Sequence, residues 1–388
     1  MPKYKFTEIA INSTEKKKPT EADKATYIGL EHLDSGTLTV SRWGSEVAPI
    51  GEKLIMKKGD VLFGKRRAYQ KKVGIAPFDG IFSAHGMVLR PREEVITKEY
   101  FPLFISSDYF LNEAIRISVG SLSPTVNWKD LKDLTFNIPT IEEQRRITPI
   151  VWAAINAKNA YRNLIQQTDD LVKSQFIEMF GDPESVLSSD VRIADVADVQ
   201  VGIVIKPTRF YADGDNGIKA FRSLNIGPMY IKDEEWVYFT EAAMEETQRT
   251  VAHTGDVLVV RSGNPGTSAV VTKEFDGCNV IDLIIAHPKK DLILPEFLCA
   301  YTNLPHGKNQ IESQQRGVAQ KHFNVGMYND LKLILPPIAE QERFVRFLKQ
   351  SDKSKFVVSN RNLSRCLATQ LTIQKLCQFI SCRGTYDI

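Results

Sequence analysis

One motif occurs twice in this chain, each time immediately before a stretch of helical character. The copies are NIPTIEEQRR at residues 137–146 and ILPPIAEQER at residues 334–343, an offset of 197 residues (334 − 137 = 197). The same offset separates Gly120 from Gly317, Asn127 from Asn324, and Phe-Asp-Gly at 78–80 from Phe-Asp-Gly at 275–277. Gly-Asp-Val-Leu at 59–62 recurs at 255–258, one residue short of that offset. The chain is therefore a tandem duplication, which limits the fold to two similar domains, each followed by a helix.

Both halves contain short strand-prone segments separated by turn residues. Examples are DVLF at 60–63 and MVLR at 87–90 in the first half, and AFRSL at 220–224 and DVLVV at 256–260 in the second. Regular alternation of strands with helices is missing, which disfavours a doubly wound parallel sheet. A hydrophobic content of 43% in 388 residues suffices for two cores. We predict an α+β fold with strand-rich domains at residues 1–140 and 183–335.

A long helix is predicted after each copy of the motif. Ile147, Val151, Ile165 and Val172 belong to a seam with alternating steps of four and three residues, which is typical of a coiled coil. Gly-Asp-Pro at 181–183 ends this helix, which we place at residues 141–182. The matching helix is placed at 336–388. Because an amphipathic helix needs a partner to cover its seam, we expect the two helices to pair; two independent hairpins are the alternative.

Charge and cysteine content limit the partners and the compartment. The net charge is only +3, and residues 183–330 carry 14 Lys+Arg against 20 Asp+Glu. Nucleic-acid binding by the second half would therefore depend on local basic clusters. The five cysteines lie in the second half and form no Cys-x-x-Cys pair, which predicts reduced thiols and no metal site. With no leader and no spanning apolar run, we expect a cytoplasmic protein.

Motifs for catalysis are missing from the sequence. It contains no phosphate-binding loop, no Gly-x-Gly-x-x-Gly after a strand, no His-Glu-x-x-His and no Gly-x-Ser-x-Gly. The segment RSGNPG at 261–266 is similar to the Asn-Pro-Pro-aromatic motif of DNA amino-methyltransferases but lacks its second proline and its ring. We interpret this segment as a turn and expect a protein without a catalytic site or a bound cofactor of its own.

A basic loop in the first half is the principal binding candidate. Five cations surround one tyrosine, an arrangement that can neutralise phosphates while Arg and Gln present forked donors and acceptors to base edges: Lys65, Arg66, Arg67, Tyr69, Gln70, Lys71 and Lys72. The repeat places this loop opposite a segment of different composition in the second half. There the candidates are Arg261, Ser262, Asn264, Thr267 and Ser268. Two readers of different sequences would need such a difference, whereas the alternative for the basic loop is a solvated surface.

A second pair of repeat-related segments offers weaker candidates. Ser123 in SLSPTVN at 121–127, and Lys321 and His322 in VAQKHFN at 318–324, could present polar groups to DNA. Turn and helix-cap chemistry explains these segments equally well.

The double Pro-x-Ile-x-Glu-Gln motif, the double Gly-Asp-Val-Leu and the two long helices together resemble one family over the whole chain. This family comprises the specificity subunits of type I restriction-modification enzymes. The resemblance implies that residues 1–140 and 183–335 are target recognition domains, each reading one half of a split DNA site. It also implies that the helices at 141–182 and 336–388 pack as an antiparallel coiled-coil spacer, with a pseudo-two-fold internal repeat.

The resemblance further implies partners. Two modification subunits, which would hold S-adenosylmethionine, are expected to dock on this chain, and restriction subunits are a further candidate. The prediction is a non-catalytic subunit that binds double-stranded DNA and positions a methyltransferase. The alternatives are a helical scaffold that does not read DNA, and a catalytic DNA methyltransferase. The sequence leaves the target bases and the spacer length open.

Overall fold

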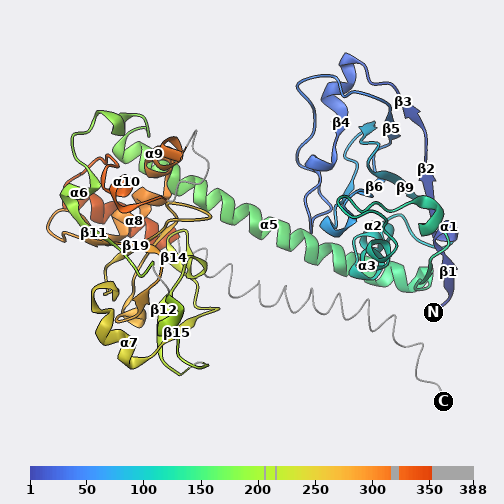
Figure 1. Ribbon diagram of the computed structural model, residues 1–388. Coiled ribbons are helices and arrows are strands. Elements are labelled where there is room, and N and C mark those ends of the chain that lie inside the picture. Colours follow the sequence, from blue (N-terminus) through green and yellow to red (C-terminus); the bar gives the residue numbers. More distant parts are fainter. Residues whose placement is uncertain (205–206, 215, 316–322, 352–388) are drawn as a thin grey trace. The chain divides into compact units, whose positions relative to one another are not determined.

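The computed structural model describes residues 1–204, 207–214, 216–315 and 323–351 (Figure 1). The described chain forms two compact units, and the boundary between them lies between Tyr161 and Arg162, inside one long helix. We call the described residues up to Tyr161 unit 1 and those from Arg162 to Ser351 unit 2.

Unit 1 is built from two four-stranded sheets. The first is antiparallel throughout, in the order β2 (Ala10–Ser13), β9 (Met87–Pro91), β6 (Val61–Phe63) and β7 (Val73–Ile75). The second has the order β3 (Lys16–Lys17), β5 (Lys53–Met56), β8 (Gly80–Phe82) and β4 (Tyr27–Ile28), with β4 and β8 parallel. A third pair joins β1 (Lys3–Lys5) to β10 (Thr135–Asn137). The short helices are α1 (Phe6–Ile9), α2 (Phe101–Ile105), α3 (Asp108–Arg116) and α4 (Trp128–Leu131).

Unit 2 repeats the first sheet strand for strand. The order β11 (Ala197–Val201), β19 (Leu283–Pro288), β16 (Val257–Val260) and β17 (Ser268–Val270) is again antiparallel throughout. The second sheet differs in order, with β12 (Ile218–Phe221) between β15 (Val237–Phe239) and β18 (Asn279–Val280), and β13 (Ile226–Gly227) pairs with β14 (Tyr230–Ile231). The helices are α6 (Ile193–Val196), α7 (Glu241–Glu246), α8 (Pro295–Asn303), α9 (Pro305–Gln315) and α10 (Val325–Asn329). The shared topology confirms the predicted α+β repeat.

Helix α5 (Ile141–Phe180) is the long helix predicted after the first motif. At about 1.5 Å per residue its 40 residues span roughly 60 Å. Its first turns cover the unit 1 core through Ile147, Val151 and Trp152, and the Trp152 indole donates to the Glu99 carbonyl (3.0 Å). After the second motif, residues 338–351 are helical. The rest of the predicted helix at 336–388, and with it the antiparallel pairing, lies outside the described residues.

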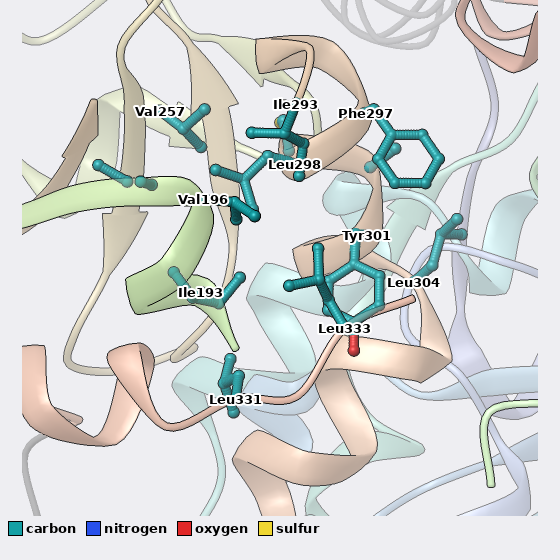
Figure 2. Packing of buried hydrophobic residues seen from close by; sticks show 14 of the residues in the cluster. Ile193, Val196, Val257, Ile293, Phe297, Leu298, Tyr301, Leu304, Leu331 and Leu333 are labelled. Atoms are coloured by element: carbon teal, nitrogen blue, oxygen red, sulfur yellow. The ribbon is translucent and has the colours of Figure 1, made fainter. Parts of the chain in front are cut away.

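The C-terminal end of α5 forms part of the unit 2 core. Phe176 and Phe180 pack against Phe297 of α8 and Phe344, with ring centroids 4.8–6.2 Å apart. Figure 2 shows side chains from α6, β16 and α8 gathered in the same core, among them Val196, Val257 and Leu298. Burying a helix end in this way fixes α5 to the domain that follows it.

The repeated Gln of the motif attaches the start of the helix that follows it to the preceding domain in both units. Gln144 is fully buried, its amide donates to the carbonyls of Val95 (2.9 Å) and Pro139 (2.8 Å), and it accepts from the Thr97 N–H (2.7 Å). Gln341, also fully buried, makes the same three bonds to residues 197 further along (341 − 144 = 197): Leu292, Pro336 and Leu294, at 2.8–2.9 Å. We call each buried Gln with its three hydrogen bonds the latch of that unit: Gln144 in unit 1 and Gln341 in unit 2.

The repeated Asp of Gly-Asp-Val-Leu joins two strands of the first sheet in each unit. Asp60 accepts from the Lys57 N–H (2.8 Å) and takes a forked pair of bonds from Arg90 (2.8 and 2.9 Å). Asp256 accepts from the His253 N–H (2.7 Å) and lies 2.6 Å from His287 Nδ1. The repeat therefore conserves the carboxylate but changes its partner from an arginine to a histidine.

This difference predicts a pH-dependent stability that is specific to unit 2. The hydrogen bond to Asp256 raises the pKa of His287, against the opposing effect of burial. The charged pair therefore stabilises unit 2 fully below about pH 6.5, the ordinary value, and this contribution is lost as pH rises through the raised pKa. The variant His287→Arg gives Asp256 the partner that Asp60 has in unit 1, and an arginine stays charged in this pH range. We therefore expect the variant not to lose this stability as pH rises. The check is the difference in thermal midpoint between variant and wild type from about pH 6 to 8; a constant difference would contradict the prediction.

Candidate nucleic-acid interface

The basic loop of unit 1 connects β6 to β7 and has a defined backbone. The Gly64 N–H donates to the Lys72 carbonyl (2.9 Å), which closes the base of the loop. A 3-10 turn at Ala68–Gln70 is flanked by Arg67 (φ 55°) and Lys71 (φ 50°), both in the left-handed region, where non-glycine residues are uncommon. Ala68 is buried and anchors the turn. The cations are thus held on an ordered turn.

Backbone and side-chain bonds join the basic loop to the segment at 119–125. Val119 and Thr125 exchange N–H to carbonyl bonds (3.0 and 2.9 Å), and we call this segment the hairpin 119–125. The Arg67 N–H donates to the Pro124 carbonyl (2.7 Å), the Val126 N–H to the Lys65 carbonyl (2.9 Å), and Arg67 Nε to Ser123 Oγ (3.3 Å). The structure therefore brings Ser123 together with the basic loop, as two candidate segments of one surface.

The five cations of the loop fall into two groups. Lys71 pairs with Asp108 of α3 (2.6 Å), and Lys72 donates to the Leu30 carbonyl (2.7 Å). By contrast, no carboxylate in the described part of the chain pairs with Lys65, Arg66 or Arg67, and both arginines are exposed. Tyr69 beside them is 53% exposed, and Gln70 is half-buried. Arg66 and Arg67 are thus the cations best placed for an external anion.

Additional basic residues surround this surface, and their effect is visible in two lowered pKa values. Burial lowers the pKa of His85, and the positive charges of Arg66, Lys65 and Lys53 lower it further. Burial and the nearby charge of Lys16 lower the pKa of Lys65. Lys16, Lys53 and His85 were not among the predicted residues, because strands β3 and β5 and the turn after β8 bring them near the loop from distant positions in the sequence. The combined positive field favours a polyanion.

The corresponding loop of unit 2 turns its side chains inward. Arg261 is the counterpart of Lys65, but its side chain is only 13% exposed, pairs with Asp282 (2.6 Å) and donates to the Phe323 carbonyl (3.1 Å). Thr267 and Ser268 are buried, and Asn303 of α8 donates to Ser268 Oγ (2.7 Å). Ser262 is half-buried, and Asn264 is exposed. The prediction that Arg261, Thr267 and Ser268 face DNA therefore does not fit the structure, because Thr267 and Ser268 are buried and Asp282 engages Arg261.

Two further predicted residues of unit 2, Lys321 and His322, lie outside the described residues. The cap interpretation holds for their neighbour Asn324, whose side chain accepts from the Met327 N–H (2.9 Å) at the start of α10. A surface hollow of about 560 Å³ elsewhere in unit 2 carries both Arg209 and Arg249 and the acids Glu245 and Glu246. Its mixed charge gives no net attraction for a phosphate chain.

The described residues lack the features of two other functional classes. These residues contain no group of three or more His, Cys, Asp or Glu side chains placed to hold a metal ion. Across the same part of the chain, no helix has the length and apolar character needed to cross a membrane.

The fold and the site together define a chain with two related α+β domains, the first with an ordered basic surface. The family described as type I restriction modification DNA specificity domain matches residues 5–167 and again residues 188–364. The chain therefore belongs to this family and carries its domain twice. The family predicted from the repeated motifs is thus confirmed.

The chain is also similar to individual proteins. The type I restriction enzyme EcoDI specificity subunit of Escherichia coli is 23% identical over 182 residues, which cover 45% of this chain and 40% of the relative. The type I restriction-modification S subunit from M. genitalium is similar in fold, with a TM-score of 0.59 and 12% identity over 97% of this chain and 95% of that one. The HsdS subunit from Thermoanaerobacter tengcongensis matches 98% of this chain and 95% of that one at 20% identity and a TM-score of 0.39.

Proposed function

We propose that this chain is the subunit that selects the DNA target of a type I restriction-modification complex. The observation that carries the proposal is the double match of the specificity-domain family, one match on each domain of the repeat. In the proposal, each domain binds one half of a bipartite site in double-stranded DNA. The basic loop of unit 1 supplies phosphate contacts through Arg66 and Arg67, and Ser123, Tyr69 and Gln70 face the same duplex.

The proposed partners carry the chemistry. Two modification subunits bind this chain and supply S-adenosylmethionine, and restriction subunits join them in the nuclease form of the complex. This chain contributes no catalytic group and no cofactor, and its role is to hold the methyltransferase over the chosen base. The complex would act in the cytoplasm, where reduced thiols such as the buried Cys278 and Cys299 are stable.

The test is a domain exchange read by methylome sequencing. Residues 183–330 are replaced by the corresponding domain of a family member with a different target, and the variant is expressed with its modification subunit in a host without other methyltransferases. Because each unit has its own sheet and core, we expect one half of the methylated sequence to change and the other to stay. A reciprocal exchange of residues 1–140 is the control and should change the opposite half.

Two results would overturn the proposal. If no methylated motif depends on this chain, it does not select a target, and the scaffold alternative is favoured. If a single exchange alters both halves, the two domains do not read independently.

A further inference from the structure

The hairpin 119–125 has an exposed apolar residue at its tip, Leu122, and another at its base, Val119. Leu122 is 91% exposed and Val119 is 66% exposed, although both residues would gain from burial. Gly120 has a φ of +119°, a left-handed conformation that allows the tight turn at the tip. Single exposed apolar side chains are common on protein surfaces, so what distinguishes Leu122 is that its hairpin is bonded to the loop that carries Arg66 and Arg67.

The tip is held in a fixed position relative to the cations. The two bonds between Val119 and Thr125 close the hairpin, and the bonds from Arg67 to Pro124 and Ser123 tie it to the basic loop. Arg66 and Thr125 also form a β-bridge. These bonds hold the backbone on the C-terminal side of Leu122 against the loop that carries Arg66 and Arg67.

The charge around the tip indicates what covers it. Arg66 and Arg67 have no carboxylate partner in the described chain, so a surface that covers them has to supply the negative charge. Nucleic acid offers the matching combination, because phosphates pair with the arginines while bases offer apolar faces and thymine methyl groups. Apolar side chains between flanking cations are used in this way by DNA-deforming proteins.

We propose that the hairpin 119–125 is the base-contacting element of unit 1, with Leu122 in apolar contact with bases while Arg66 and Arg67 hold adjacent phosphates. The proposal rests on the DNA-reading function proposed above and adds the residue that contacts the bases. Two kinds of contact share this chemistry: insertion between stacked base pairs, and packing on a thymine methyl group.

The experiment uses the full chain assembled with its modification subunits and a duplex that carries the target found by methylome sequencing. Leu122→Ser should weaken binding by about 10-fold or more, with the salt dependence unchanged because no charge is lost. Leu122→Met keeps the apolar contact and should bind like the wild type. Leu187→Ser, which alters another exposed leucine (59% exposed) in unit 2, is the matched control and should also be silent.

Two modified duplexes separate the kinds of contact. If Leu122 inserts, 2-aminopurine at the contacted step should become fluorescent with the wild type but not with Leu122→Ser. If Leu122 packs on a methyl group, replacing one target thymine by uracil should weaken the wild type to the level of Leu122→Ser. Either result supports the proposal.

Results that contradict the role of Leu122 can be told apart from results that contradict the proposed function. Wild-type binding by Leu122→Ser would overturn the proposal, and so would loss of the modification subunit from that variant, which would make the hairpin a protein-docking surface. Failure of the proposed function would appear earlier, as a wild-type complex without any methylated target.

Discussion

Replacing Gln144 by Leu should lower the stability of the protein by about 3 kcal/mol, because the change removes all three hydrogen bonds of the latch and keeps the side chain's volume. The Thr97 N–H and the carbonyls of Val95 and Pro139 would lose this partner around a fully buried site. Each buried backbone group without a partner costs about 1–3 kcal/mol, and such costs are not additive. For units of this size, the midpoint of thermal unfolding should fall by roughly 6–12 °C.

The repeat provides a second form of the same test. Gln341→Leu should have a similar effect, since Leu292, Pro336 and Leu294 occupy the equivalent positions around it. Gln167→Leu, an exposed position on α5, is the control and should change stability by less than about 0.5 kcal/mol. Differential scanning calorimetry of the three variants measures the effect. Equal midpoints for Gln144→Leu and Gln167→Leu would show that water replaces the latch without loss.

The sequence predicted the repeat, the strand-rich domains and helix α5, because these depend on local patterns and on spacing along the chain. The role of the motif's Gln was hidden, since a polar residue in a helix is ordinarily exposed and two of the three partners of Gln144 lie 47 and 49 residues away. The repeated Phe-Asp-Gly also has a structural role, because its Asp binds a backbone N–H in both units. Asp79 accepts from the Lys58 N–H and Asp276 from the Thr254 N–H. The two halves of the repeat therefore share polar side chains that hydrogen-bond to buried or turn backbone groups, as well as apolar core positions.

The binding surface was predicted less completely, because a basic residue's neighbours decide whether its charge is available. The run at 65–72 shows five equal cations, but tertiary contacts with Asp108 and Leu30 engage Lys71 and Lys72. In unit 2, Ser268 of the matching loop is bonded to Cys299 and Asn303 of α8 inside the core, which no local pattern reveals. The residues that contact DNA thus remain predictions, and the paired lysines of the basic loop provide the means to test them.

Arg66→Ala/Arg67→Ala should weaken DNA binding by roughly 60-fold at 0.1 M salt, with a salt slope smaller by about 1.8, if each arginine holds one phosphate. The control, Lys71→Ala/Lys72→Ala, removes the same charge from the same loop, but its lysines are engaged by Asp108 and the Leu30 carbonyl. This control should change the slope by less than half as much. Fluorescence anisotropy of a labelled duplex over a salt series, with the assembled complex, measures both slopes. If the two double variants lose affinity equally, the loop acts only through its total charge, and Arg66 and Arg67 have no special role in binding. If neither double variant changes the salt slope, the loop is a solvated surface and unit 1 binds DNA through another surface.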